Sequence, residues 1–220
     1  MFEHLREHTM SPDLDELTTD LGVSHAAHDR SNLRWIPIRS LGQSQRETIL
    51  KHLMTLSAED RQRRFGHVIS DERLAAYTQS MDFERDALFG VYDRALRLAA
   101  LVHLAFGALG ALPEAMAEFG ISVLPRMRGR GVGSLLFDHA ATLARNRGVH
   151  TLMIHLARDN ASMLNIVRKA GAGITFIGGD ASASLSLPAD TLGSQIQELL
   201  GHQAAELDFR LKRQGLRLPT

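Results

Sequence analysis

One segment of the sequence constrains the fold more than any other, because it joins a strand to a helix through a loop of arginines and glycines. The segment Val123–Ser134 reads VLPRMRGRGVGS. Pro125 ends the expected strand, and an amphipathic helix is expected over 131–147, where apolar residues recur on one face. The first turn of a helix offers unpaired main-chain N–H groups and a partial positive charge, and glycines let an anion approach the backbone. The segment therefore predicts a binding site for a phosphate or pyrophosphate group.

Two common phosphate-binding motifs do not fit this segment. The phosphate loop of ATP-binding proteins requires a lysine directly after a glycine, and no glycine of the segment is followed by lysine. The dinucleotide-binding fingerprint has the spacing GxGxxG after the first strand of a parallel unit. Here the spacing is GxGxG and the strand comes late in the chain. The pattern that fits is RxxGxG, formed by Arg128, Gly131 and Gly133.

The remaining sequence predicts one α/β domain between two flanking segments. Apolar alternation or short apolar runs predict strands over 34–39, 87–93, 96–106, 116–124, 151–157, 174–178 and 182–188. Helical spacing and capping residues predict helices over 44–56, from Ser57, from Ser70, and over 131–147, 160–170 and 192–213. Pro37 favours an edge position for the first strand. We expect an N-terminal arm (1–33), a central domain (34–190) and a C-terminal helix with a tail (191–220).

The loop and a second motif resemble the GNAT superfamily of acetyl-CoA-dependent N-acetyltransferases. The second motif is an asparagine-led helix that ends in Lys-x-Gly, and it reads NASMLNIVRKAG over Asn160–Gly171. The resemblance covers 34–187 in element order and is specific over 117–171. It implies that the central domain is an acyl-CoA-binding catalytic domain of α/β (α+β) class. Its mixed, mostly antiparallel sheet would be flanked by helices and splayed between the fourth and fifth strands.

The resemblance also implies which residues hold acetyl-CoA. In the family, the main-chain amides of the RxxGxG loop hold the pyrophosphate of coenzyme A. The corresponding residues here are Arg128, Gly129, Arg130, Gly131, Val132, Gly133 and Ser134. Main-chain groups of the preceding strand pair with the pantetheine arm, which implies Ile121, Ser122 and Val123. Asn160 is expected to contact the same arm.

Acetyl transfer to an amine requires loss of a proton, because fewer than about one alkyl ammonium in a thousand is neutral at pH 7. A glutamate on the strand before the loop is often the base in this family, and Glu118 lies on that strand. His155 is a second candidate, acting through water, and His103 is a third. The alternative interpretation makes Glu118 a solvated strand residue and both histidines packed structural residues. The tyrosine that many members use as the acid is replaced here by Val167, and Ala172 replaces the usual aromatic residue.

The acceptor is expected to be the primary amine of a small molecule or of a protein lysine. The lysine is suggested by the segment 56–65, LSAEDRQRRF, which is similar to a segment of bacterial protein-lysine acetyltransferase domains. Its arginines, Arg61, Arg63 and Arg64, are typical of a solvated helix face and alternatively form a rim for an acidic acceptor. Segments 40–86 and 107–116 are expected to line the acceptor cleft. The missing tyrosine keeps open a second function, a non-catalytic acyl-CoA-binding regulatory module.

The composition narrows the classes of catalysis, partner and metal site that are expected. The chain lacks cysteine, which excludes thiol catalysis and cysteine-containing metal sites. Its 25 basic and 25 acidic residues cancel, so no nucleic-acid partner is expected, with RNA binding by the basic loop as a weaker alternative. No secretory signal or membrane-spanning run is apparent, so we expect a cytoplasmic protein without a membrane partner. His25 and His28 lack a third ligand, so no metal is expected. The C-terminal helix, rich in leucine and glutamine, is a candidate for homodimer formation.

Overall fold

The computed structural model describes residues 36–107, 116–188 and 204–213 of the 220-residue chain. All of them belong to the unit Ile36–Thr220. The predicted arm 1–33, with His25 and His28, lies outside the described residues. The helix predicted over 192–213 is helical over 204–213, and its first part also lies outside the described residues.

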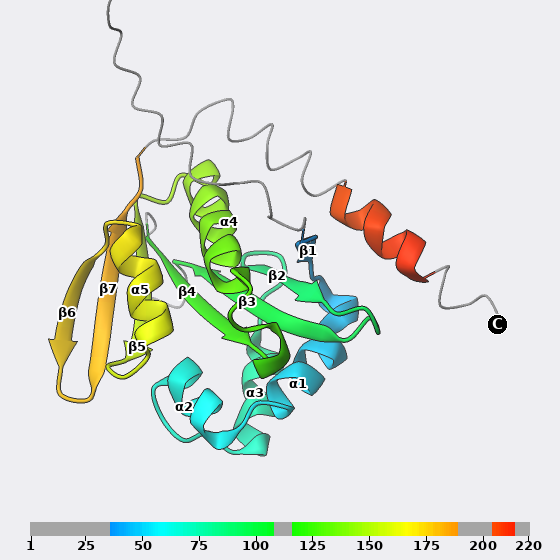
Figure 1. Ribbon diagram of the computed structural model, residues 1–220, viewed down its shortest axis with the longest axis horizontal. Coiled ribbons are helices and arrows are strands. Elements are labelled where there is room, and N and C mark those ends of the chain that lie inside the picture. The colour runs from blue at the N-terminus through cyan, green and yellow to red at the C-terminus, as the bar shows by residue number, and fades with distance from the viewer. Residues whose placement is uncertain (1–35, 108–115, 189–203, 214–220) are drawn as a thin grey trace, which may run out of the picture. The chain divides into compact units, whose positions relative to one another are not determined.

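A seven-stranded sheet forms the centre of this unit (Figure 1). Its strands lie in the order β1-β2-β3-β4-β5-β7-β6. Their bounds are β1 Arg39–Ser40, β2 Ala87–Tyr92, β3 Leu98–Phe106, β4 Met116–Val123, β5 Thr151–Ala157, β6 Gly173–Ile177 and β7 Asp180–Ser186. Every neighbouring pair is antiparallel except β4 and β5, which are parallel. The expected mixed, mostly antiparallel sheet is confirmed.

The first strand is shorter than the sequence predicts. Strand pairing begins only at Arg39, and residues 36–38 form no regular structure. Strand β1 lies at one edge of the sheet, as Pro37 suggested. Proline has no main-chain N–H and cannot take part in a strand ladder as a donor, so pairing starts beyond it.

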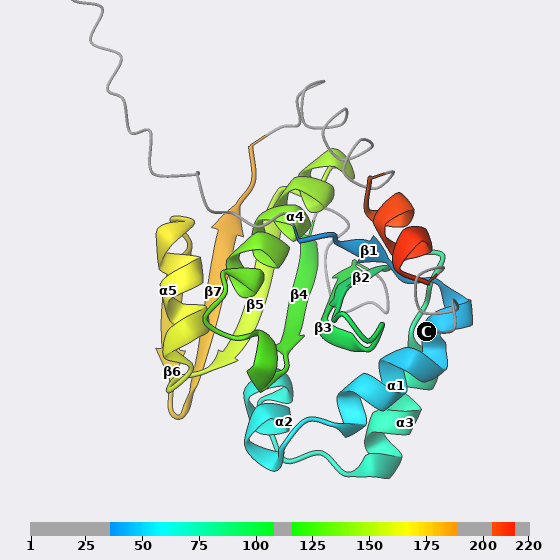
Figure 2. The same ribbon diagram turned by 45° about the vertical axis from the view of Figure 1, so that its right-hand side comes forward.

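Helices cover both faces of the sheet (Figure 2). Their bounds are α1 Arg46–Met54, α2 Ala58–Phe65, α3 Asp71–Ser80, α4 Val132–Asn146 and α5 Ala161–Lys169, with short 3-10 turns η1 Gln43–Gln45 and η2 Pro125–Met127. The predicted caps of α2 and α3 are present. The Ser57 hydroxyl accepts a hydrogen bond from the Asp60 N–H at 3.1 Å. The Ser70 hydroxyl accepts one from the Arg73 N–H at 3.4 Å.

Two apolar cores lie on the two faces of the sheet. Helices α4 and α5 pack on one core, in which the rings of Phe119 (β4) and Phe137 (α4) meet at 5.2 Å. Helices α1 and α3 pack on the other, which contains Leu53, Leu74 and Leu101. Side chains alternate along a strand, so the residues of β4 are divided between the faces. Phe119 faces α4, whereas Ser122 faces α1.

Strands β4 and β5 separate part of the way along their length. They pair only from Met116 opposite Thr151 to Glu118 opposite Met153, although β4 continues to Val123 and β5 to Ala157. Helix α2 contacts both strands. The splay between the fourth and fifth strands, which the resemblance implied, is thus present and begins directly after Glu118.

Candidate active site

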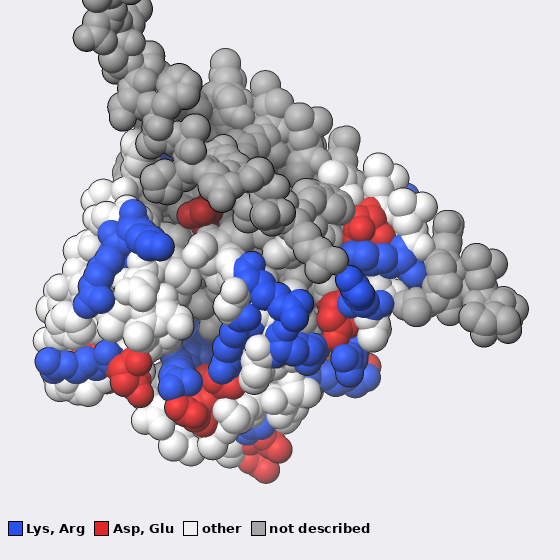
Figure 3. All heavy atoms as spheres, in the orientation of Figure 1, with Lys and Arg blue, Asp and Glu red and all other residues white. Residues whose placement is uncertain are grey.

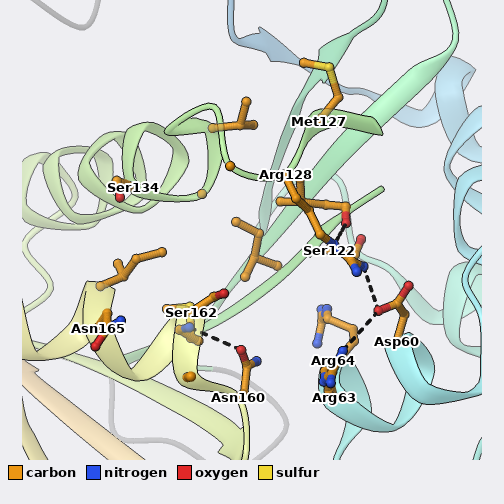
Figure 4. Close-up of a pocket in the computed structure, with 18 of the residues that line it drawn as sticks. Asp60, Arg63, Arg64, Ser122, Met127, Arg128, Ser134, Asn160, Ser162 and Asn165 are labelled. Carbon is orange, nitrogen blue, oxygen red and sulfur yellow. Dashed lines mark hydrogen bonds and ion pairs between the residues drawn. The ribbon is translucent and has the colours of Figure 1, made fainter. Parts of the chain in front are cut away.

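A cavity of about 490 Å³ opens where β4 and β5 separate (Figure 4). Its walls come from the end of β4, the loop before α4, the first turns of α4 and α5, and helix α2. The lining residues are Leu56, Asp60, Arg63, Arg64, Ile121–Val123, Met127–Gly129, Gly131–Ser134, Asp159–Met163, Asn165, Ile166 and Lys169. In Figure 3, basic side chains gather around this region and acidic side chains lie beside them.

The main chain of β4 offers an unpaired edge to the cavity. The Leu124 N–H donates to the Ala99 carbonyl at 2.9 Å, which continues the register between β4 and β3. Main-chain groups alternate in direction along an antiparallel strand, so Ser122 also bonds toward β3. The main-chain groups of Ile121 and Val123 point the other way, toward the space that β5 has left. Of the three strand residues predicted to pair with the pantetheine arm, these two have the required orientation.

The first turn of α4 presents free main-chain donors to the same cavity. Gly131 is the N-cap and provides no side-chain cap, and the Leu135 N–H is the first to bond back to it, at 3.0 Å. The N–H groups of Val132, Gly133 and Ser134 therefore have no acceptor within the helix. Gly131 has φ 75°, a left-handed conformation that favours glycine, and brings the chain into the helix at this point. The arrangement suits an anion such as pyrophosphate.

The three arginines of the loop have different environments. Arg128 lines the cavity, but its guanidinium is already bound: Nη2 lies 2.6 Å from Asp60 Oδ1, and Nε donates to the Val123 carbonyl at 2.9 Å (Figure 4). Arg126 pairs with Asp93 at 3.1 Å outside the cavity. Arg130 is exposed and does not line the cavity, so its contact with the cofactor stays a prediction.

A second helix begins at the opposite wall. Asn160 lines the cavity and caps α5, because its Oδ1 accepts from the Met163 N–H at 3.2 Å. Below this turn, Val167 is fully buried in the core. The position at which the resemblance implied a tyrosine acid is therefore filled by an apolar side chain that packs in the core.

The two predicted catalytic residues lie on the splayed strands, and neither is among the residues that line the cavity. Glu118 is half-buried on the α1 face of β4, at the last residue that pairs with β5. His155 is exposed on β5, two residues beyond that point, and pairs across the sheet with Ser182 of β7. Glu118 is therefore the candidate that lies at the apex of the splay.

A buried histidine contacts the cavity residue Ser122. His52 of α1 is 3% exposed, with Nδ1 3.1 Å from the Leu98 carbonyl and Nε2 2.7 Å from Ser122 Oγ. The carbonyl can only accept, so Nδ1 carries the proton and the Ser122 hydroxyl donates to Nε2. Burial lowers the pKa of His52 from 6.5 to about 4, which keeps the imidazole neutral.

A second polar chain crosses the α1 face of the sheet and ends at the cavity. Tyr77 of α3 lies between Arg64 Nη2, at 3.1 Å, and His103 Nδ1, at 2.7 Å. His103 Nε2 lies 2.8 Å from Asp86 Oδ2. His103, the third candidate from the sequence, is thus a half-buried link in a chain of hydrogen bonds, with Arg64 as its end on the cavity wall.

Sequence reasoning missed His52, Tyr77 and Asp86. Each joins the site through a partner 17 to 70 residues away, so no local spacing marks it. The available signal was a polar residue within an apolar pattern, as for His103 in the run LAALVHLAF.

Other kinds of site find no support in the described part of the chain. Within 36–107, 116–188 and 204–213, no group of three or more His, Asp or Glu residues could hold a metal ion. No helix among these residues is long and apolar enough to cross a bilayer.

Comparison with known proteins agrees with this geometry. The model of the acetyltransferase (GNAT) family matches residues 57–172. No curated protein matches the chain significantly. Among solved structures, the GNAT domain of S. lividans PAT is similar at 23% identity and a TM-score of 0.57, over 68% of this chain and 89% of that one.

Two further solved structures share the fold. An N-acetyltransferase from Staphylococcus aureus Mu50 is 16% identical, with a TM-score of 0.53 over 69% of this chain and 98% of that one. A ribosomal-protein-alanine N-acetyltransferase from Brucella melitensis is also 16% identical, with a TM-score of 0.52 over 68% and 99%. These likenesses concern the fold, whereas the family match covers more than half of the sequence. The chain belongs to the GNAT family of acetyltransferases.

Proposed function

We propose that this protein is an N-acetyltransferase that moves the acetyl group of acetyl-CoA to a primary amine by direct attack of the amine. The observation that carries the proposal is the cavity between β4 and β5, which offers two kinds of unpaired main-chain group. The amides of Val132, Gly133 and Ser134 suit a pyrophosphate. The edge of β4 that faces away from β3, at Ile121 and at the Val123 N–H, suits an extended arm that adds to the sheet like a further strand, whereas the Val123 carbonyl already accepts from Arg128.

These two features fix the direction in which the cofactor would lie. The phosphate end would sit at the start of α4, and the arm would run back along β4 toward Glu118. Glu118 lies five residues before Val123 on β4, a distance of about 17 Å at the usual rise of a strand. When bound, acetyl-CoA supplies the thioester that the amine attacks. Its reacting carbon would lie near the apex of the splay.

Glu118 is the residue that we propose as the base. It accepts a proton from the amine, directly or through a water molecule, while the nitrogen bonds to the acetyl carbon and the carbon–sulfur bond breaks. A main-chain N–H on the unpaired edge of β4 stabilises the charge that develops on the carbonyl oxygen. The departing thiolate takes its proton from solvent, since Val167 cannot donate one. His155 remains a second candidate for proton transfer.

The acceptor is a primary amine of a small molecule or a protein lysine. A non-catalytic role in acyl-CoA binding is the alternative, and the buried Val167 in place of a tyrosine is the observation that favours it. Coenzyme A release would be measured with acetyl-CoA and a panel of free amino acids, polyamines and lysine peptides, with N-acetyl products identified by mass spectrometry. Release that depends on the amine and matches the product supports the enzyme. Binding of acetyl-CoA without turnover of any amine supports the regulatory module.

A further inference from the structure

Arg64 on the cavity wall is an arginine without a carboxylate partner. Four neighbouring arginines each form an ion pair, namely Arg61 with Asp71, Arg63 with Glu59, Arg126 with Asp93 and Arg128 with Asp60. For Arg64, none of the described carboxylates comes within ion-pair distance, and its Nη2 donates a hydrogen bond to the neutral phenol of Tyr77. A half-buried cation that lacks a counter-ion favours binding of an anionic group. Figure 4 shows the Arg64 head group directed into the cavity beside Arg63.

The backbone of β4 makes room for this guanidinium. A Cβ atom built on Gly120 would overlap the Nη2 and Cζ atoms of Arg64, so any other residue there would displace the head group. Gly120 lies two residues beyond Glu118 on the same face of the strand. The Arg64 charge therefore lies at the reacting end of the cavity, away from the free amides at the start of α4.

Three further residues hold the guanidinium in this position. Arg64 can only donate, so it donates to the Tyr77 oxygen, and the single phenolic proton goes to His103 Nδ1. His103 then donates from Nε2 to Asp86, which also accepts from Arg85 Nε at 2.9 Å. Burial raises the pKa of Tyr77, which keeps the phenol protonated. The phenol and the imidazole each have one donor role in this chain, which holds Arg64 Nη2 against Tyr77 and leaves other N–H groups of the guanidinium available to a ligand.

We propose that Arg64 is the specificity residue for the acceptor and binds a carboxylate that lies close to the reacting amine, and that Tyr77, His103 and Asp86 are its positioning residues. Guanidinium matches a carboxylate with two parallel hydrogen bonds. Glu118 on one side and Arg64 on the other would then face the amine and the carboxylate of the same acceptor. The inference rests on the proposed function, since it assigns the acceptor end of that site. The carboxylate could belong to a free amino acid or to an acidic residue beside a lysine.

The test compares acceptors that differ only in the carboxylate. Small probes are the common L-amino acids and their methyl esters, and peptide probes are the capped sequences Ala-Lys-Glu-Ala and Ala-Lys-Gln-Ala. We expect kcat/KM for the carboxylate form to exceed that for its neutral match by about tenfold or more, as for a charge-assisted hydrogen bond. The pair that shows the larger ratio identifies the source of the carboxylate. A ratio near one for both pairs would overturn the inference.

Variants of the chain assign the effect to Arg64. Arg64→Gln should reduce the ratio to about one and Arg64→Lys should retain part of it, because lysine keeps the charge but loses the paired geometry. Arg73→Gln is the matched control, since it removes an exposed cation from α3 outside the cavity and should leave the ratio unchanged. A ratio that persists in Arg64→Gln, together with weaker binding of acetyl-CoA, would make Arg64 a cofactor residue and overturn the inference.

The positioning residues need a measurement that simple loss of stability does not affect. Tyr77→Phe and His103→Gln should lower the carboxylate-to-ester ratio, mainly by raising the KM of the carboxylate acceptor. Both acceptors are assayed on the same folded enzyme, so a purely structural defect would lower both rates and leave their ratio intact. An unchanged ratio in both variants would remove the positioning role.

Failure of the proposed function would be recognised separately. If no amine is acetylated although acetyl-CoA binds, the N-acetyltransferase proposal fails, and calorimetry with the same probes in the presence of CoA then tests Arg64. The inference would be upheld if the carboxylate form gives heat of binding with the unmodified protein and gives none with Arg64→Gln. Absence of such heat in the unmodified protein would overturn it.

Discussion

Asp60 of α2 and Arg128 of the loop before α4 form an ion pair at the wall of the cavity, with Oδ1 and Nη2 2.6 Å apart. The side chain of Asp60 is only 9% exposed, and Arg63 Nη1 lies 3.8 Å from the same oxygen. Arg128 also donates to the Val123 carbonyl at the end of β4. The first residue of the RxxGxG motif thus ties the loop to both α2 and β4, and its guanidinium is engaged within the protein.

This pair should contribute to stability and to cofactor binding together. We expect Asp60→Asn to lower the free energy of unfolding by about 1 to 3 kcal/mol, because Arg128 loses its partner, and to weaken acetyl-CoA binding through the loosened loop. A double-mutant cycle with Arg128→Gln, measured by urea unfolding, should show a coupling of about 1 kcal/mol. Additive effects would mean that the pair does not hold the loop. Arg126→Gln, which breaks a pair outside the cavity, is the control for acetyl-CoA binding.

The left-handed glycine at the start of α4 permits a sharper comparison. Gly131 and Gly148 have φ of 75° and 74°, and a Cβ at either position meets no atom within 4 Å. Replacement by alanine should therefore cost about 1 kcal/mol of stability at both positions through the backbone alone. Only Gly131→Ala places a methyl group in the cavity, so only this variant should weaken acetyl-CoA binding in calorimetry. Equal affinities in the two variants would contradict the phosphate site at this turn.

The buried imidazole of His52 predicts a pH dependence of stability. Burial lowers its pKa from 6.5 to about 4, so between these values the unfolded chain binds a proton that the folded chain does not. Stability is therefore complete above pH 6.5 and is lost as the pH falls, by about 2 kcal/mol at pH 5 from this group. Arg64 and Arg126 act in the same direction, and the hydrogen bond to Leu98 opposes them.

Urea unfolding at pH 7.5 and pH 5 would measure this effect. His52→Gln should reduce the difference between the two pH values, whereas His155→Gln, which removes an exposed histidine, should leave it unchanged. A stability that is equally pH-dependent in the original protein and in His52→Gln would show that His52 is not the group responsible.

Glu118 at the apex of the splay predicts a catalytic defect without a binding defect. We expect Glu118→Gln to lower kcat by about a hundredfold, the lower end of the usual contribution of a general base, with acetyl-CoA binding unchanged. The remaining activity should rise with pH as the free amine becomes more abundant. The same measurements on His155→Gln compare the two candidates, and a larger loss there would place proton transfer on β5 instead.

Local signals were sufficient to predict most of the fold and the glycine loop that lines the cavity. Periodicity marked α4, the serines marked the starts of α2 and α3, and the glycines marked the loop, because each of these depends on residues close in the chain. The resemblance added the splay. Strand 34–39 was predicted too long, since its alternation does not reveal where pairing starts.

The different roles of the three arginines of α2 could not be predicted in this way. Arg61, Arg63 and Arg64 were treated as one group, typical of a solvated face or alternatively of a rim for an acidic acceptor, because they are close in sequence and alike in charge. Their environments differ only after folding, when Asp71 reaches Arg61 and Tyr77 reaches Arg64. His52 likewise gains Ser122 from 70 residues away. Contacts between residues far apart in the chain produce no regular sequence spacing, so the sequence alone does not predict them.

We propose that the cavity between β4 and β5 holds acetyl-CoA, and thermal unfolding with and without this ligand is the best test. We expect a clear rise in the unfolding temperature, equivalent to about 2.7 kcal/mol when the ligand is at a hundred times its dissociation constant. Gly131→Glu, which places a carboxylate at the phosphate site, should abolish the rise. No rise with millimolar acetyl-CoA or CoA in the unmodified protein, or the same rise in Gly131→Glu, would contradict this proposal.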